Sequence, residues 1–76
     1  MAIFFFHIRD GALLIPDDEG LECFSLAAVH REGSLSAGDL ITAHIREGTF
    51  PHGKAIEITD EHGSAIASMA ARMQLH

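Results

Sequence analysis

Two apolar runs near the N-terminus flank an Asp-Gly pair at 10–11 and predict a β-hairpin with strands over residues 2–9 and 12–15. Asp-Gly is a strong signal for a tight hairpin turn, because such a turn requires positive φ at its central residues. A two-residue loop at this pair fixes the register and places Ile8 opposite Leu13. The proline that follows the second run ends its strand, because proline lacks the N–H that a ladder requires.

Alternation of side chains gives this hairpin two different faces. One face is apolar throughout and is expected to pack in the core; it consists of Phe4, Phe6, Ile8, Leu13 and Ile15. The other is apolar at one end and charged at the other, and it consists of Ile3, Phe5, His7, Arg9, Ala12 and Leu14. We call this second face, and the side of the sheet to which it belongs, the open face.

The middle of the chain predicts one amphipathic helix over residues 26–47, between a Ser25 N-cap and a Gly48 C′ residue. At 100° per residue one stripe of the helix carries Leu26, Val29, Gly33, Ala37, Leu40, Ile41 and His44. Glycine costs a helix about 1 kcal/mol relative to alanine, so Gly33 and Gly38 leave the continuity of the helix open. Gly33 lies within the stripe, which favours a close approach of the helix to a sheet.

The last third of the chain predicts a second hairpin after a loop over 48–53. Residues 54–59 alternate between apolar and polar, as a half-buried strand does. The Asp-Glu-His-Gly segment at 60–63 suits a type I turn with glycine in the left-handed position, and a turn requires a partner strand. We therefore expect a return strand over 64–69, although its Ala and Met content also favours a helix.

Together these elements predict a single α+β domain over residues 1–76, of order ββαββ, with an antiparallel sheet of about four strands and one helix packed on one face. One helix covers one face only. The open face is then left with exposed apolar side chains, namely Ile3, Phe5, Leu14, Ala65 and Ala67. Such patches usually mark an interface, and a second copy of the chain is a common cover, which predicts a homodimer or one protein partner.

Composition narrows the classes of partner and compartment. Eleven carboxylates against five Lys and Arg give a net charge of −6, which argues against nucleic acid and anionic membranes as partners. Cys23 is the only cysteine, and the chain has neither a basic leader nor an apolar run long enough to span a bilayer. These features favour a cytoplasmic protein without disulfides.

Candidate chemistry is sparse. The six histidines are His7, His30, His44, His52, His62 and His76. His7 is predicted on the open face and His44 on the helix stripe that faces the other side, so the two are not expected to share a metal. An acidic cluster lacks the spacing of a calcium loop; it consists of Asp10, Asp17, Asp18, Glu19 and Glu22. The sequence has no phosphate loop, nucleophile elbow or dinucleotide motif. We expect no enzyme, no cofactor and no metal site.

Two functional hypotheses follow from the residues. In the leading one, the chain is a small interaction or regulatory module whose open face binds a copy of itself or a protein. Its anchors would be Ile3, Phe5 and Leu14, with His7 and Arg9 as a polar rim. In the alternative, the chain is a metal- or pH-responsive binder that uses His7 at an interface.

Three motifs carry a resemblance to a known family: Phe-His-Ile-Arg-Asp-Gly at 6–11, Asp-Asp-Glu-Gly at 17–20 and Ile-Glu-Ile-Thr-Asp-Glu-His-Gly at 56–63. They resemble a family of short single-domain proteins of unknown function that is abundant in rhizobia and related alphaproteobacteria. The resemblance implies a cytoplasmic stand-alone domain and a strand over 64–69, and it implies no activity.

A looser similarity links the order of strand, strand, acidic turn and Ser-Leu-Ala-Ala helix to antitoxin domains with a partial ribonuclease-H-like sheet. Those domains have a third strand before the helix, which here would be residues 21–24. The similarity implies a third function, that of an antitoxin-like partner of a separate toxin.

Overall fold

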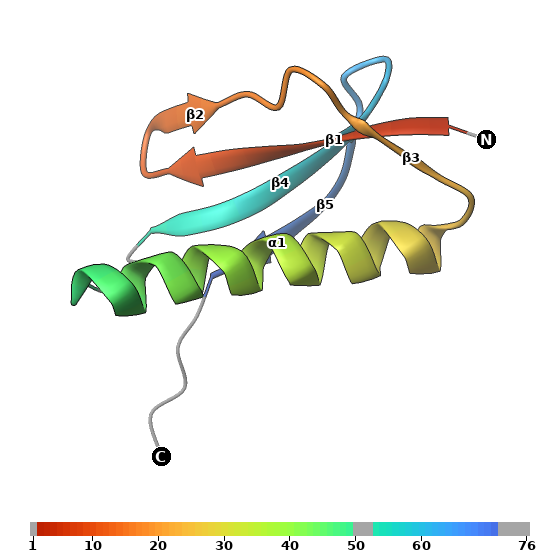
Figure 1. Cartoon of the computed structure of the whole chain (residues 1–76). Coiled ribbons are helices and arrows are strands. Elements are labelled where there is room, and N and C mark those ends of the chain that lie inside the picture. The colour runs from red at the N-terminus through yellow and green to blue at the C-terminus, as the bar shows by residue number, and fades with distance from the viewer. Residues whose placement is uncertain (1, 50–52, 72–76) are drawn as a thin grey trace.

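A computed structural model describes residues 2–49 and 53–71 and shows one antiparallel sheet with one long helix against it (Figure 1). The element order is β1 (Ala2–Asp10), β2 (Leu13–Ile15), β3 (Leu21–Cys23), α1 (Leu26–Glu47), β4 (Lys54–Asp60) and β5 (Ala65–Ala70). The α+β class is confirmed. The sheet has five strands rather than about four, because Leu21–Cys23 also pairs with β1. His52, His76 and part of the predicted 48–53 loop lie outside the described residues.

β1 is the central organising strand. Along one edge it pairs with β4, which in turn pairs with β5, so the sheet order is β2-β1-β4-β5. Two short strands share the other edge: β2 pairs with residues 8–10 of β1, and β3 pairs with residues 2–4. Residues 5–7 lie between them at a gap in that edge.

The N-terminal hairpin has a register that differs from the predicted one. Its turn is the Gly-Ala pair at 11–12 rather than the Asp-Gly pair at 10–11, so Ile8 pairs with Ile15 and not with Leu13. The first turn residue has φ +60° and the second does not have positive φ, which fits a type II′ turn. Each β1 residue of this hairpin pairs with a residue two positions beyond the predicted partner. Because two positions is one full period of a strand, the side chains keep the faces that alternation predicts.

α1 is continuous and has the predicted ends. Ser25 Oγ accepts the N–H of Ala28 at 3.1 Å, and Gly48 adopts the left-handed conformation at φ +72°. Gly33 lies directly against the sheet, since a Cβ at this position would stand only 2.8 Å from Ile58 Cδ1. Gly33 therefore permits the close approach predicted for it, and it does so without breaking the helix.

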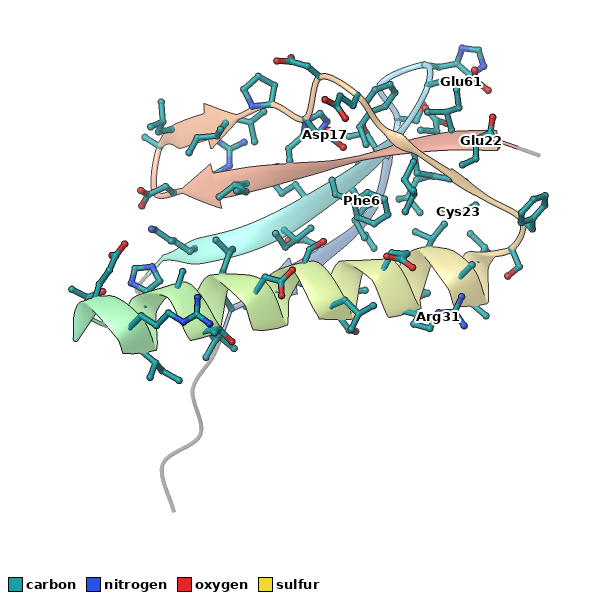
Figure 2. The ribbon with its side chains drawn as sticks, in the orientation of Figure 1. Phe6, Asp17, Glu22, Cys23, Arg31 and Glu61 are labelled. Atoms are coloured by element: carbon teal, nitrogen blue, oxygen red, sulfur yellow. The ribbon has the colours of Figure 1, made fainter. Side chains whose placement is uncertain are left out.

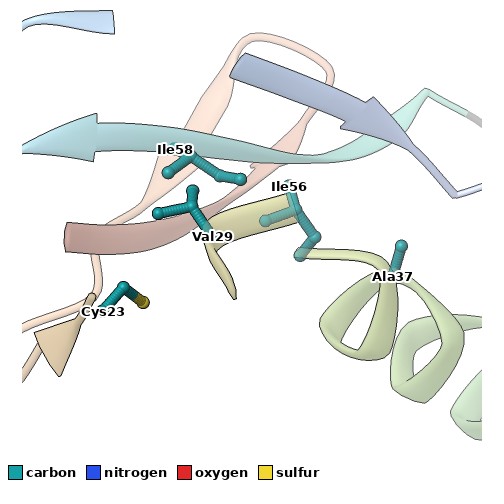
Figure 3. Packing of buried hydrophobic residues seen from close by; sticks show 5 residues of the cluster. All are labelled: Cys23, Val29, Ala37, Ile56 and Ile58. Carbon is teal, nitrogen blue, oxygen red and sulfur yellow. The ribbon is translucent and has the colours of Figure 1, made fainter. Parts of the chain in front are cut away.

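The core lies between α1 and the sheet (Figure 3). Its buried apolar cluster consists of Cys23, Val29, Ala37, Ile56 and Ile58, against which Phe4, Phe6 and Ile8 pack. The predicted core face of β1 is thus confirmed. The prediction that Leu13 and Ile15 also pack in the core is wrong: they are 60% and 45% exposed, because α1 lies over the β4–β5 side of the sheet (Figure 1).

The second hairpin is confirmed, and the return segment is strand rather than helix, over Ala65–Ala70. Asp60 holds its turn together: Oδ1 accepts the N–H groups of His62 and Ser64, each at 2.9 Å. Gly63 takes the left-handed position at φ +82°. The turn chemistry predicted for 60–63 is therefore the chemistry that the structure uses.

A register shift interrupts the β4–β5 ladder between Ile58 and Thr59. On the side of this shift away from the turn, Ala67 pairs with Ile58 and packs on the helix side of the sheet. The prediction that Ala67 lies on the open face is wrong, because one extra residue in a strand reverses the alternation. Ala65, which pairs with Thr59, remains on the open face.

Candidate functional site

The structure brings the five residues predicted for an interface onto the open face, on the side away from α1. Ile3, Phe5, His7 and Arg9 alternate along β1 with the residues that pack in the core, and Leu14 pairs with Arg9 across the hairpin. Ile3 and Leu14 are 37% and 39% exposed, and the other three side chains are partly buried. The five residues form one surface that runs from apolar to charged along β1.

An ion pair marks the charged end of the open face. Arg9 Nε donates to Glu57 Oε2 at 2.6 Å and Nη2 donates to Oε1 at 3.2 Å, which is a bidentate geometry. The side-chain hydrogen bond from Arg9 holds the pKa of the Glu57 carboxyl below its usual value. Arg9 Nη1 also donates to the carbonyl of Ala12 at 3.4 Å, so every guanidinium nitrogen has a partner.

His7 occupies the middle of the open face with both ring nitrogens engaged. Nδ1 lies 3.0 Å from the backbone N of Asp17 and accepts its N–H, so Nδ1 carries no proton. In the neutral ring Nε2–H then donates to Thr59 Oγ1, which lies 3.0 Å away. The imidazole also stacks on Phe5, with ring centroids 6.2 Å apart and planes within 7°.

This direction of hydrogen bonding bears on catalysis. In a nucleophilic hydroxyl–histidine pair the hydroxyl donates to the imidazole, which takes its proton as a general base. Here the ring of His7 donates to Thr59 and accepts from a main-chain amide. The arrangement orients His7 and holds β1 to β4, and it does not activate Thr59 as a nucleophile.

The acidic loop over 16–20 fills the gap in the β1 edge. Asp17 Oδ2 accepts the N–H of Phe6 at 3.1 Å, where a strand partner would otherwise sit between β2 and β3. Asp17 Oδ1 accepts the N–H groups of Glu19 and Gly20 at 3.2 and 3.3 Å. Figure 2 shows Asp17 on the side of β1 away from α1, whereas Phe6 points toward the helix.

These hydrogen bonds set the charge of Asp17. Partial burial raises the pKa of its carboxyl, but the N–H donors of Phe6, Gly20 and Glu19 together lower it by more, so the pKa lies below the usual value. Asp17 is therefore a carboxylate at neutral pH, and the loop is held by a charged acceptor.

Gly20 packs the loop onto the apolar end of the open face. A Cβ at Gly20 would stand 2.7 Å from Ile3 Cγ2 and 3.0 Å from Phe5 Cε1, so the loop backbone lies directly against both side chains. The expectation that no other part of the chain covers the open face is wrong at this end. An Asp followed three residues later by Gly is the signal for such a self-bonded loop.

Two other candidate side chains, Cys23 and His44, lie in the interior of the protein. Cys23 is buried, and burial raises the pKa of its thiol, which keeps the sulfur protonated. His44 is buried at the helix end, where Nδ1 lies 2.6 Å from Thr49 Oγ1. In residues 2–49 and 53–71 no group of three His, Cys, Asp or Glu side chains is arranged to hold a metal ion.

Among the described residues no helix combines the length and the apolar character needed to cross a bilayer. Comparisons with curated proteins and with solved structures find no match to this chain. A comparison with protein families matches residues 3–72 to a domain of unknown function, DUF6894. The match spans nearly the whole chain, and the protein therefore belongs to the DUF6894 family.

Proposed function

We propose that this protein is a small non-catalytic binding module that holds a protein partner on its open face. The observation that carries the proposal is a set of accessible apolar side chains beside a fixed polar frame. Ile3 and Leu14 are each more than a third exposed, while Arg9 is held by Glu57 and the turn. Such a surface binds with little loss of conformational entropy, because its polar groups are ordered beforehand.

The negative charge beside the apolar end of the open face indicates the kind of partner. The apolar end of the open face is bordered by the acidic loop, whose Asp18 and Glu19 side chains are exposed. A protein that inserts an apolar side chain and surrounds it with Lys or Arg complements this arrangement in shape and charge. A reducing compartment such as the cytoplasm suits the single thiol, Cys23.

Two adjacent residues of β2 offer a matched test. Leu14 lies on the open face and Leu13 on the opposite face, and both are exposed, at 39% and 60%. The full chain serves as bait in native extracts, and co-purified proteins are quantified by mass spectrometry. We expect a partner to be retained by wild type and by Leu13→Lys and lost with Leu14→Lys. A wild type that retains nothing, or a Leu14→Lys bait that retains the same partner equally, contradicts the proposal.

An antitoxin-like role is a second candidate, and one observation favours it. β3 (Leu21–Cys23) directly precedes α1, where the looser similarity requires a third strand. In this role the partner on the open face is a basic toxin. A basic co-purifying protein that arrests growth when it is expressed alone would support the role, and a partner without such an effect would exclude it.

The hypothesis that His7 binds a metal receives no such support. Both of its ring nitrogens are engaged, by Asp17 and by Thr59, and a metal would have to displace one of them. Titration of the chain with Zn²⁺ is expected to give no saturable heat.

A further inference from the structure

The two outer edges of the sheet differ in how they are protected. The β2–β3 edge consists of two three-residue strands, separated by Pro16 and the acidic loop that Asp17 holds. The β5 edge is a six-residue strand, Ala-Ile-Ala-Ser-Met-Ala, without charge or proline. Natural proteins usually protect an edge strand with charges, prolines, bulges or very short length, and after the register shift near Ala65 the β5 residues Ala67–Ala70 carry none of these. Among the described residues β5 pairs only with β4.

The ladder between β4 and β5 shows which groups this edge presents. Ala71 N–H donates to the carbonyl of Lys54 at 3.0 Å, so this pair exchanges its hydrogen bonds inward. Because inward and outward pairs alternate in an antiparallel ladder, Met69 also bonds inward. The N–H and C=O groups of Ser68 and Ala70 therefore point away from β4, at the free edge.

The flank of α1 above this edge is also uncharged. Ser34, Gly38, Ile41 and Ile45 recur at a spacing of four, three and four and lie in one row of the helix. Ser34 Oγ lies 3.8 Å from Met69 Sδ, and a groove between this row and β5 is lined by Ser34, Gly38, Ile41, Ser68 and Ala70 among others. The other flank of α1 carries Glu32 and Asp39. Ile45 is 58% exposed.

We infer that the β5 edge binds a second copy of this chain, antiparallel and two-fold symmetric, with Ser68 opposite Ser68. Charge favours a second copy as the occupant. A protein of net charge −6 is repelled least by its own copy at a surface without carboxylates, and none of the eleven carboxylates lies on β5 or on the helix row above it. In the antiparallel arrangement the acidic 60–63 turns of the two copies lie at opposite ends of the shared ladder.

A two-fold symmetric pairing of β5 agrees with the alternation of its side chains. A two-fold axis perpendicular to the sheet places Ala67 opposite Met69 of the second copy, so residues of the same face meet. Both helices then lie on one side of a continuous sheet, and the uncharged rows of the two helices face each other across the groove. Dimerisation also adds buried surface to a chain of 76 residues, a size at which a single core gives limited stability.

Sedimentation velocity over a dilution series of the full chain at neutral pH tests the inference. Wild type is expected to be a dimer that dissociates on dilution. Ser68→Pro removes an N–H that the protomer does not use and fills the edge with a ring, so we expect a dissociation constant raised about ten-fold or more. A wild type that is monomeric at every concentration, or a Ser68→Pro variant that dimerises like wild type, overturns the inference.

A second pair of variants decides the matter even if Ser68→Pro does not fold, as judged by circular dichroism. Ser34→Lys changes the row where it borders β5, whereas Leu35→Lys changes the outer side of the same helical turn, and both positions are exposed. Only Ser34→Lys is expected to weaken the dimer, and equal behaviour of the two overturns the inference. The open-face variant Leu14→Lys should stay dimeric, so this inference and the proposed function fail separately; a monomeric Leu14→Lys would move the dimer contact to the open face.

Discussion

The two faces of the sheet are held by different physical means. On the helix side Val29 and Ile58 are fully buried and belong to the apolar core cluster. On the open face partly exposed side chains are joined by hydrogen bonds, with Asp17 bonded to Phe6 and His7. Burial contributes most of the folding free energy, whereas polar links in contact with water contribute less and fix geometry. The helix side thus stabilises the fold, and the open face gives it a defined surface.

The largest effect is expected from truncating the same residue type on each face. Ile58→Ala should lower the free energy of unfolding by about 3 kcal/mol, because it leaves a cavity in the core. Ile3→Ala, at a site that is 37% exposed, should cost about 1 kcal/mol, since water replaces the lost contacts. Urea denaturation measures both. Equal losses would break the distinction between the faces.

Asp17→Ala should have the next largest effect, about 2 kcal/mol, because it leaves Phe6 N–H without its charged acceptor and releases the loop. Hydrogen exchange of the Phe6 amide should become faster in this variant. Asp18→Ala is the control, since the neighbouring carboxylate is exposed. Unchanged protection of Phe6 in Asp17→Ala would show that the acidic loop does not hold the β1 edge.

Two glycines of α1 test how closely the helix approaches the core. Gly38 has open space around it, so Gly38→Ala should stabilise the protein by about 1 kcal/mol through helix propensity. Gly33→Ala should gain less or lose stability, because its Cβ would lie 2.7 Å from Met69 Sδ. Thermal unfolding compares the two variants. The same gain at both positions would mean that Gly33 is not needed for the approach.

The smallest expected effect is the loss of stability at acidic pH that Asp17 causes. The folded-state pKa of Asp17 lies below its ordinary value of 3.8, so the carboxylate stabilises the fold fully above that value and loses this contribution as the pH falls below it. The difference in unfolding free energy between wild type and Asp17→Ala should stay constant from neutral pH to about pH 5 and narrow below about pH 4. A difference that does not narrow below about pH 4 would show that the Asp17 carboxylate does not hold the loop.

Local patterns were sufficient to predict the elements whose ends and faces local chemistry determines. Ser25 and Gly48 mark the ends of α1 in the sequence because each satisfies backbone groups of its own helix. Alternation placed Ile3, Phe5 and Arg9 on one face of β1, because a strand has a period of two whatever its partner is.

Features that depend on distant contacts could not be read in this way. The first turn formed one residue later than its Asp-Gly pair predicts, and the Gly11 N–H bonds to the carbonyl of Gly53, which lies in a segment remote in sequence. The bond from Phe6 to Asp17 likewise requires β2 and β3 to be in place. No periodicity encodes either contact, and the partial cover of the open face depends on the second.

The pairing of β1 with β4 has a consequence for synthesis. Phe4 pairs with Asp60, so the central ladder joins a strand made early to one made after the whole helix. At about 5–20 residues per second, roughly 3–10 seconds separate the translation of the two strands. During that time the Phe4–Phe6 segment can bond only to Leu21 of β3 and to Asp17, and a few short strands without the rest of their sheet are marginal in water. The Phe4–Phe6 segment therefore waits for its β4 partner until the second hairpin has been synthesised.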